Sequence, residues 1–443
     1  MKYDPEQAPS KPTRMLLAHP TGNEFSRNAA LAFHEAGMLA EFWTAIAWDP
    51  KSRLSHVVPA GLRRQLERRS FSEQFAEKIH TYPWRETGRL LAARLNFRGL
   101  TRHERGVFSV DSVYQTMDKH IAARLAKHPE INAVYAYEDG ALSMFQEMRR
   151  NEGQCIYDLP IGYWRAARKI QQEEAQLQPA WAPTLSANLD SIEKLDRKDQ
   201  ELLLASQIIV ASTFTWKTLA HAPNISAPIK IVPYGAPEPA PHRAKTRRGP
   251  LKVLFTGILS QRKGVSYLFD AIDKLGTNVE LTLIGQPPGP CPALEKALSR
   301  HRWIRSLPHA QVLEEMDRHD VFVFPSLFEG FGLVLLEAMS RGMAVITTPH
   351  TAGPDLISDG NDGFIVPIRS SEAIVERIEL LLRDRALLQD VSDAARKTAG
   401  GHSWRGYRAG LLHAVTSSQK ARYHTTTRNI PRAPSTRASS TPV

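Results

Sequence analysis

Short apolar runs alternate along the chain with longer segments in which apolar residues recur at helical spacing. In the N-terminal half these runs lie at residues 15–18, 133–137 and 155–159, and two more end at Val210 and Val232. Helical patterns separate the runs, as at residues 113–128 and 140–149. Because this alternation is typical of buried parallel strands joined by helices, we predict an α/β domain with a parallel sheet.

The C-terminal half shows the same alternation more regularly. Strands are expected at residues 253–257, 279–285, 321–325, 344–347 and 364–367, each followed by an amphipathic helix. Such an order predicts a second doubly wound, Rossmann-like sheet. Open parallel sheets bind ligands at the carboxyl ends of their strands, so the candidate chemistry should lie there.

A proline-rich connector separates the two halves. Residues 235–250 read GAPEPAPHRAKTRRGP and have no apolar periodicity, which is typical of a linker between domains. We therefore predict an N-terminal Rossmann-like domain over residues 1–240 and a C-terminal one over residues 241–400, facing each other across a cleft. Residues 418–443 are basic, lack acidic residues and are rich in Ser, Thr and Pro, so they are expected to be disordered.

The composition excludes several classes of protein. With 443 residues, of which 42% are hydrophobic and 23% charged, the chain is typical of a globular protein with more than one domain. The only cysteines, Cys155 and Cys291, have no Cys or His cluster at metal-binding spacing around them, which argues against a disulfide scaffold or a zinc ribbon. No apolar segment is typical of a signal peptide or a membrane span. We expect a cytoplasmic protein.

A formal net charge of +11 is concentrated partly in residues 61–106, where basic residues are interleaved with aromatic ones such as Tyr82 and Trp84. Two interpretations of this basic segment stay open. It forms either a peripheral contact with the anionic inner face of a membrane or a solvated helical face. A nucleic-acid partner is not expected, because no nucleic-acid-binding motif accompanies the charge.

The strongest local motif is a pair of glutamates in residues 324–339, which read FPSLFEGFGLVLLEAM. A strand ends before Glu329, two glycines follow, and a helix begins near Leu333. Glycines allow the backbone to approach a ligand, and the free N–H groups of a helix N-terminus attract phosphate or sugar oxygens. Carboxylates accept hydrogen bonds from paired hydroxyl groups, so Glu329 and Glu337 are candidates to hold a sugar and a ribose.

This motif resembles the Glu-x7-Glu element of the retaining glycosyltransferases of family 4, also called glycosyltransferase group 1, which have the GT-B fold of two facing Rossmann-like domains. The matching residues are Pro325, Ser326, Glu329, Gly330, Phe331, Gly332, Glu337, Ala338 and Met339. The resemblance continues through residues 253–264 (VLFTGILSQRKG), 283–285, 307–309, 344–348, 360–367 and 404–407. It covers the C-terminal half well and the N-terminal half weakly.

The resemblance implies a binding site for the nucleotide diphosphate sugar donor. Its expected residues are Gly257, Arg262, Lys263, Glu329, Gly330, Phe331, Gly332, Leu333 and Glu337. Glu329 would lie at the donor sugar, Glu337 would hold the ribose hydroxyls, and Lys263 would pair with the diphosphate. The backbone of residues 330–333 would contact sugar and phosphate.

One position departs from the family pattern. Many members have Arg directly after the glycine equivalent to Gly257, whereas this chain has Ile258 there. Arg262 is the nearest substitute for the missing cation. The alternative is that Arg262 and Lys263 belong to a solvated loop.

On the N-terminal side, Gly22 lies in the loop HPTGN after the first strand, and Glu138 and Asp139 follow the strand at residues 133–137. In the family a polar residue near such positions orients or deprotonates the acceptor hydroxyl. The resemblance therefore implies Glu138 as a catalytic residue beside Glu329 and Lys263, with Gly22 and Asp139 on the acceptor side. The alternative is that Glu138 or Asp139 only favours the start of the next helix.

The resemblance implies transfer of a sugar, with retention, from a UDP or GDP sugar to a hydroxyl group. The acceptor would be a glycan, a lipid-linked molecule or a small molecule, in polysaccharide or glycoconjugate synthesis. Residues 401–417 would form a helix that crosses back to the first domain. No cofactor is expected, and no metal, because the Asp-x-Asp pair that commonly holds a divalent cation is missing from the sequence.

Two other functions remain as alternatives. A sugar-nucleotide epimerase of GT-B fold would use the donor without an acceptor, and a basic binding protein would have no catalytic activity. A dinucleotide dehydrogenase is disfavoured, because no Gly-x-Gly-x-x-Gly follows the first strand.

Overall fold

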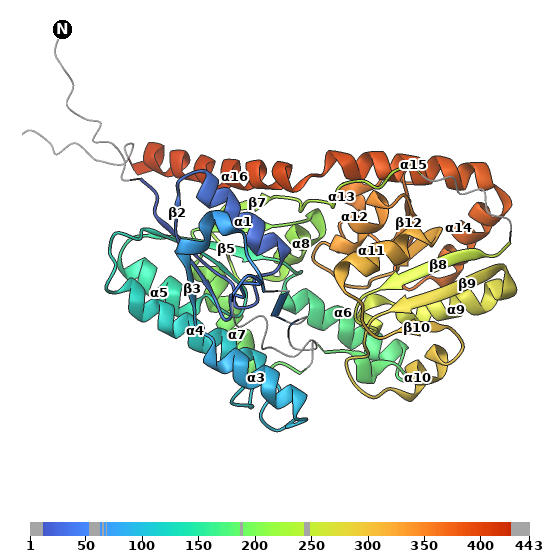
Figure 1. Cartoon of the computed structure of the whole chain (residues 1–443), viewed down its shortest axis with the longest axis horizontal. Coiled ribbons are helices and arrows are strands. Elements are labelled where there is room, and N and C mark those ends of the chain that lie inside the picture. Colours follow the sequence, from blue (N-terminus) through green and yellow to red (C-terminus); the bar gives the residue numbers. More distant parts are fainter. Residues whose placement is uncertain are drawn as a thin grey trace, which may run out of the picture.

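The computed structural model describes residues 12–52, 63, 66–67, 69–186, 189–242 and 249–426, with the backbone alone over 418–426. Within these ranges the chain folds into two parallel sheets, each surrounded by helices (Figure 1). The predicted α/β class with two doubly wound sheets is confirmed. Residues 427–443 of the predicted disordered tail lie outside the described residues.

The first sheet has seven strands in the order β3-β2-β1-β4-β5-β6-β7. These are β1 (Met15–Ala18), β2 (Leu39–Thr44), β3 (Ile79–Thr81), β4 (Ala133–Tyr137), β5 (Gln154–Leu159), β6 (Gln207–Val210) and β7 (Ile229–Ile231). Its helices are α1 (Glu24–Glu35), α3 (Trp84–Arg94), α4 (Val110–Leu125), α5 (Leu142–Arg150), α7 (Ile192–Leu204) and α8 (Thr213–Thr218). The sheet reverses its strand order between β1 and β4, and ligands bind at such switch points in open parallel sheets.

The second sheet has six strands in the order β10-β9-β8-β11-β12-β13. These are β8 (Leu251–Thr256), β9 (Val279–Ile284), β10 (Arg302–Ile304), β11 (Val321–Phe324), β12 (Ala344–Thr347) and β13 (Phe364–Ile365). The helices are α9 (Val265–Leu275), α10 (Pro292–Leu298), α11 (His309–Asp317), α12 (Leu333–Ser340), α13 (Gly353–Leu356), α14 (Ser371–Arg383) and α15 (Arg385–Gly401). Its switch point lies between β8 and β11.

One helix leaves the first domain and packs on the second. α6 (Trp164–Leu177) and the short helix η3 (Ala182–Thr184) follow β5 in sequence, yet α6 lies beside the second sheet in Figure 1. Trp181 stacks on Phe269 with ring centroids 5.8 Å apart, and the backbone N–H of Gln261 donates to Thr184 Oγ1 at 2.8 Å. A stretch of the predicted N-terminal domain therefore contributes to the surface of the C-terminal one.

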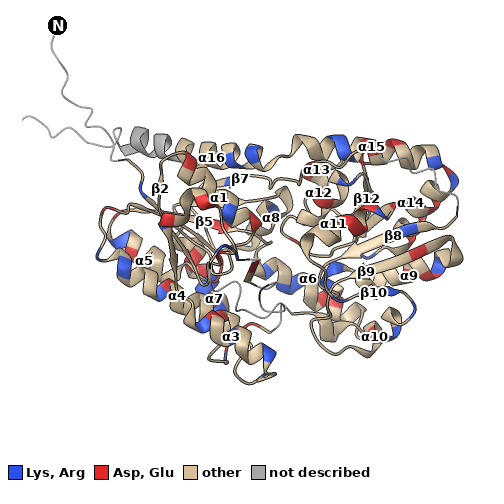
Figure 2. Cartoon of the chain, in the orientation of Figure 1, with Lys and Arg blue, Asp and Glu red and all other residues tan. Residues whose placement is uncertain are grey.

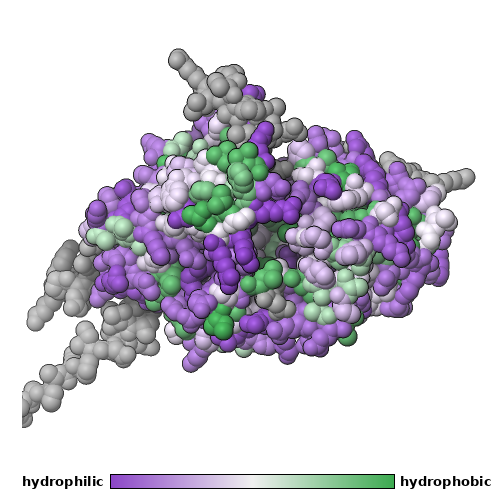
Figure 3. All heavy atoms as spheres, turned by 90° about the horizontal axis from the view of Figure 1, so that it is seen from below, coloured by the Kyte–Doolittle hydropathy of each residue, from purple (hydrophilic) through white to green (hydrophobic). Residues whose placement is uncertain are grey.

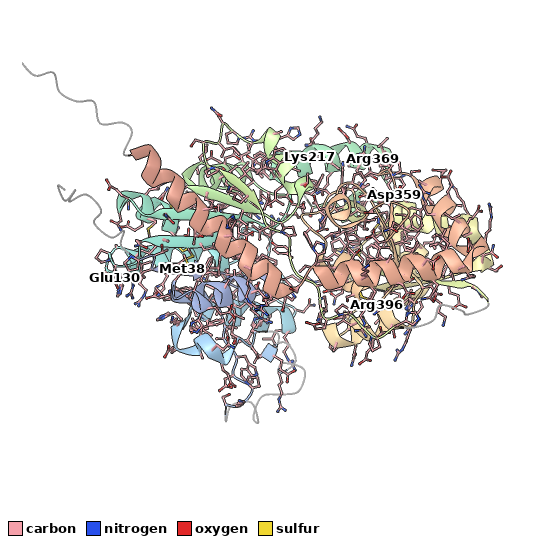
Figure 4. The ribbon with its side chains drawn as sticks, turned by 90° about the horizontal axis from the view of Figure 1, so that it is seen from above. Met38, Glu130, Lys217, Asp359, Arg369 and Arg396 are labelled. Carbon is pink, nitrogen blue, oxygen red and sulfur yellow. The ribbon has the colours of Figure 1, made fainter. Side chains whose placement is uncertain are left out.

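The last helix, α16 (Trp404–Thr426), returns to the first domain and packs on α1. Arg408 Nη1 donates to Asn28 Oδ1 at 3.0 Å, and Gln207 Nε2 donates to the carbonyl of Ala414 at 2.8 Å. Figure 4, seen from above, shows the helix running across the first domain. It continues to Thr426, past residue 417, where the predicted helix ends. The prediction that the chain is disordered from residue 418 is therefore wrong for residues 418–426, which extend this helix.

Candidate active site

The carboxylate of Glu329, on the loop between β11 and α12, is shared by two cations. The ammonium of Lys263 contacts Glu329 Oε2, and Arg262 Nη1 lies 3.4 Å from the same oxygen. Arg262 Nη1 also donates to the carbonyl of Phe328 at 2.8 Å. Lys263 is buried and Arg262 nearly so, so the alternative of a solvated loop is wrong. The structure brings these three predicted donor residues together.

Burial sets the electrostatics of this group. It lowers the pKa of Arg262 to about 10, and burial together with the neighbouring Arg262 charge lowers the pKa of Lys263. Contact with the Glu329 carboxylate opposes that effect and favours the ammonium form of Lys263. Two cations against one carboxylate leave an excess of positive charge at this strand end, which favours a bound anion.

Two glycines are required by close backbone contacts here. Gly264 has a φ of 70°, and a Cβ on it would lie 2.1 Å from the carbonyl oxygen of Pro325. A Cβ on Gly330 would lie 1.9 Å from the carbonyl oxygen of Pro160, in the first domain. Side chains at these positions would separate the turn after β8 from the Glu329 loop, or that loop from the first domain.

The Glu329 loop is held against the first domain by hydroxyl groups at the start of α8. The carbonyl of Gly330 accepts from Ser212 Oγ and, at 3.0 Å, from Thr215 Oγ1. Nearby, the backbone N–H of Thr213 donates to Asp355 Oδ2 at 2.8 Å. The backbone that the resemblance assigns to sugar and phosphate therefore also connects the two domains.

The other predicted donor residues lie around the same strand ends. Gly332 has a φ of 82° and precedes α12, whose first residue is the half-buried Leu333. Phe331 is buried, with its ring centroid 5.2 Å from that of Tyr234. Gly257 follows β8 with a φ of 140°.

Glu337 lies in α12 and is held by a histidine that the sequence analysis did not assign to the site. His309, the first residue of α11, places its Nε2 atom 2.9 Å from Glu337 Oε1. This hydrogen bond raises the pKa of His309 above its ordinary value, against the effect of burial. Among the described residues, Glu337 forms no hydrogen bond or ion pair with Glu329 or Lys263.

On the first domain, Glu138 follows β4 and lies beside a lysine of α7, with 11% of its side chain exposed. Its Oε2 accepts from Lys198 Nζ at 3.2 Å. Burial raises the pKa of Glu138, while Lys198 opposes the shift. Its neighbour Asp139 has a φ of 74° and accepts from Arg197 Nη2 at 3.0 Å.

Other carboxylates occupy the N-terminus of α5. Asp118 accepts from the backbone N–H groups of Ser143 and Met144, at 2.8 and 2.9 Å, and Glu201 accepts from those of Asp139 and Ala141, at 2.9 and 3.0 Å. The backbone N–H groups of Asp139, Ala141, Ser143 and Met144 are therefore satisfied by Asp118 and Glu201 rather than by the side chains of Glu138 and Asp139.

A cavity of about 300 Å³ joins the two sides. Glu138 and Lys198 line it from the first domain, Arg262 and Phe328 from the second, and Trp164 from α6. Figure 2 shows basic and acidic positions on the ribbon where the two domains meet. One candidate residue of the donor side and one of the acceptor side thus face a single hollow. Lys198 and Trp164 were missed by the sequence analysis, since neither lies in a motif.

The predicted acceptor-side residue Gly22 does not belong to the lining of this cavity. Its φ is 57°, and a Cβ there would lie 2.3 Å from the ring of Phe71. Its backbone N–H donates to Nδ1 of the buried His19 at 3.0 Å. Burial lowers the pKa of His19 to about 3, so this histidine is neutral and orders the loop as a hydrogen-bond acceptor.

Comparison with known proteins finds a family match over the part of the chain that contains the predicted donor residues. A family model for glycosyl transferases group 1 matches residues 240–398. The capsular polysaccharide biosynthesis glycosyltransferase CapM from Staphylococcus aureus is 31% identical over 155 residues, which make up 32% of this chain and 40% of CapM. The chain thus matches less than half of the length of this relative.

Solved structures resemble nearly the whole chain at low identity. Sucrose-phosphate synthase from Thermosynechococcus elongatus has a TM-score of 0.62 and 16% identity, covering 94% of this chain and 100% of that one. HepE from Anabaena, in complex with UDP-glucose, has a TM-score of 0.61 and 14% identity, covering 91% of this chain and 99% of that one. The chain therefore has the GT-B fold, and residues 240–398 in its C-terminal half match the family model of the glycosyl transferases group 1.

Proposed function

We propose that this protein is a glycosyltransferase that moves a sugar from a nucleotide diphosphate sugar to an acceptor hydroxyl, with retention of the anomeric configuration. The observation that carries the proposal is the cavity lined by both Arg262 and Glu138. The match of residues 240–398 to the family model of the glycosyl transferases group 1 supports the reaction class. The UDP-glucose bound by HepE supports a nucleotide sugar as donor. Residues 241–400 would form the donor-binding domain, and residues 1–240 would supply the acceptor side.

In the proposed reaction, positively charged groups stabilise the nucleoside diphosphate as it leaves. As the bond between the anomeric carbon and the phosphate oxygen breaks, negative charge develops on the leaving group. Arg262, Lys263 and the N-terminus of α12 would stabilise that charge, and the contact of both cations with Glu329 at this strand end supports this role. Glu329 is paired with these cations in the structure. When the donor diphosphate binds the cations in its place, Glu329 would accept hydrogen bonds from the sugar hydroxyls.

The acceptor hydroxyl would attack from the face that the diphosphate leaves. A bond forms between its oxygen and the anomeric carbon, and its proton passes to the departing phosphate oxygen. Glu138 would orient the hydroxyl group, because it lines the cavity and burial raises its pKa. The proposed activity is that of a hexosyltransferase, with Glu329, Lys263 and Glu138 as catalytic residues.

We propose that the reaction is independent of a metal ion. Among the described residues, the group that has metal-ligand spacing is His103, Glu104 and Asp190. Lys194 Nζ and Lys198 Nζ lie 3.0 and 3.6 Å from the carboxylate oxygens of Asp190. A divalent cation would have to compete with both ammonium groups there, so these residues do not suit it.

We further propose that the surface around α3 contacts an anionic membrane, so that a lipid-linked acceptor suits the site. Nearly half of the large hydrophobic side chains that are exposed in the described residues fall within 84–110. They are Trp84, Leu91, Leu95, Phe97, Leu100, Val107 and Val110. Arg94, Arg98, Arg102 and Arg105 are exposed among them. Figure 3, seen from below, shows green patches among purple ones on the face where Figure 1 places α3.

This membrane surface is described only in part. Its acidic residues within 84–110 are Glu86 and Glu104, and the Glu104 side chain is only 19% exposed. Glu86 is buried and paired with Arg69 and Arg89, so it does not offset the exposed arginines. Arg64 and Arg68 of the predicted basic segment lie outside the described residues. No helix in the described ranges has both the length and the apolar character needed to cross a bilayer.

The reaction is tested with the purified chain, a panel of UDP and GDP sugars, and extracts that supply acceptors. A glycosyltransferase releases free nucleoside diphosphate when acceptor is added, and NMR of the product reports the anomeric configuration. Conversion of the sugar nucleotide without an acceptor would indicate an epimerase. Salt-dependent binding to DNA, with no thermal shift from any sugar nucleotide, would indicate the non-catalytic alternative.

The membrane surface is tested by sedimentation with vesicles of neutral lipid, with and without anionic lipid. We expect binding to the anionic vesicles that falls with salt and is lost in Leu95→Ser combined with Phe97→Ser. Leu380→Ser is the control, since Leu380 is exposed on α14 of the other domain. Equal binding of anionic vesicles by the wild type and both variants would contradict the proposed membrane contact.

A further inference from the structure

A buried carboxylate on α6 is bound entirely by side chains of the second domain. Glu174 Oε1 accepts from Gln261 Nε2 at 2.8 Å and from the Tyr267 hydroxyl at 2.9 Å. Glu174 Oε2 accepts from Arg369 Nε at 2.8 Å. Glu174 is 0% exposed. Its partners come from three separate places in the second domain: the turn after β8, helix α9 and the segment after β13.

Gln261 connects this carboxylate to the cation pair. It directly precedes Arg262 and Lys263 in the short helix η5 (Gln261–Lys263), and it is fully buried. Its Oε1 accepts from the backbone N–H of Ser266 at 3.1 Å, and its own backbone N–H donates to Thr184 Oγ1 at 2.8 Å. The turn that carries both cations is therefore held by α6 and η3.

The same helix also forms a wall of the cavity. Trp164 and Gln171 of α6 line it together with Arg262. Figure 4 labels Arg369 on the second domain, close to the ribbon of α6. The position of α6 therefore governs both the shape of the cavity and the placement of the turn at residues 261–263.

We propose that Glu174 is a positioning residue for the cations that bind the donor diphosphate. This inference rests on the proposed function. A buried carboxylate with three donors fixes its partners strongly, and its removal leaves buried donors without an acceptor. The side chain of Gln261 then loses its anchor, and Arg262 and Lys263 shift from the donor phosphates. Misplacement by about 1 Å costs about a hundredfold in rate at such sites.

The test compares Glu174→Ala, Glu174→Gln and Glu173→Gln in the full-length chain. Glu173 is the matched control, because it lies next in α6 and faces Arg369 Nη2 at 3.3 Å but is about half exposed. Binding of UDP and GDP is measured by calorimetry, and KM is measured separately for donor and acceptor. We expect Glu174→Ala to weaken nucleoside diphosphate binding and raise the donor KM at least tenfold, with the acceptor KM unchanged. Glu174→Gln should restore part of the loss, and Glu173→Gln should match the wild type.

A double-mutant cycle with Lys263→Ala separates positioning from a general loss of structure. If Glu174 acts through the cations, Glu174→Ala adds little to the loss in donor binding already caused by Lys263→Ala. Additive losses, or a Glu174→Ala chain that binds nucleoside diphosphate as the wild type does, would overturn the inference. Should Glu174→Ala fail to fold, Glu174→Gln and Gln261→Leu are used in the same cycle.

The failure of this inference is distinguishable from that of the proposed function. If the wild-type chain binds no nucleoside diphosphate and releases none from any sugar nucleotide, both fail. If the wild type binds and the Glu174 variants bind equally well, the proposed function stands and only the role of Glu174 is wrong.

Discussion

Arg262 and Glu138, which belong to different domains, line one cavity of about 300 Å³. Arg262 reaches it from the turn after β8, and Glu138 from the end of β4. Each side chain lies at the carboxyl end of a central parallel strand, where open sheets bind their ligands. The donor-side and acceptor-side residues meet only because the two domains face each other. A substitution on one side can therefore be tested while the residues of the other side are unchanged.

Lys263→Ala should slow the release of nucleoside diphosphate by about a hundredfold, because a cation opposite the leaving group is lost. Lys263→Arg should keep part of the rate. Turnover is followed by coupled detection of free UDP or GDP. Lys274→Ala is the control, since Lys274 pairs with the exposed Glu372 on the outside of the second domain. Turnover that is unchanged in Lys263→Ala would place the diphosphate elsewhere.

Glu337→Ala should weaken donor binding about tenfold, with a smaller effect on kcat, because the lost carboxylate accepts from hydroxyl groups away from the reacting bond. Calorimetry with UDP and with the sugar nucleotide gives the change directly. Glu314→Ala serves as the control, because Glu314 lies on the neighbouring helix α11. A donor affinity equal to that of the wild type would remove Glu337 from the site.

The pair of Glu337 and His309 predicts a titration that NMR can follow. The carboxylate stabilises the imidazolium, so the pKa of His309 lies above its ordinary value in the free protein. In Glu337→Gln that pKa should fall, and the His309 resonances should titrate at lower pH. Identical titration curves in the two chains would show that the pair does not form in solution.

Glu138→Gln should lower the rate of transfer while leaving the affinity for the donor unchanged, because the residue lies on the acceptor side of the cavity. We expect a loss of about tenfold to a hundredfold in kcat. Glu130→Gln is the control, since Glu130 precedes the same strand but is exposed and remote from the junction (Figure 4). A weaker donor affinity in Glu138→Gln would move this residue to the donor side.

Asp158 in β5 predicts a dependence of stability on pH. It is buried and accepts from the Tyr135 hydroxyl at 2.6 Å, and burial raises its pKa from 3.8 to about 7. The folded chain therefore binds a proton that the unfolded chain releases, and this stabilisation is lost as the pH rises from about 4 to about 7. Asp158→Asn should be more stable relative to wild type at pH 8 than at pH 5, by about 2–4 kcal/mol. Urea unfolding at the two pH values measures the difference, and equal differences would show that Asp158 is ionised in the folded chain.

The central strands could be predicted because their residues are apolar on both faces. β1, β4 and β12 have the predicted bounds. β2 was missed because Glu41 interrupts its apolar pattern. In the folded chain that carboxylate is paired with Arg124 at 2.6 Å and accepts from the indole N–H of Trp43 at 2.7 Å. The short strands β3 and β10, at sheet edges, were missed as well.

The donor motif could be predicted because its residues are close in sequence and their spacing follows from a strand, a loop and a helix. The side chains that contact those residues could not be predicted. His309 and Glu337 come from different helices, and Glu174 reaches Gln261 across the two domains. A carboxylate on an amphipathic helix gives no sign in the sequence that buried donors surround it. Such contacts depend on how the domains dock, which no local pattern encodes.

The path of α6 has a consequence for the integrity of the molecule. The chain passes to the second domain at α6, returns at α7, leaves again after β7 and comes back with α16. Neither half is therefore a self-contained length of polypeptide. Dividing the chain at the proline-rich connector would separate the C-terminal fragment from α6, the helix that carries Glu174. The two halves should therefore unfold in a single transition and should not be stable as separate fragments.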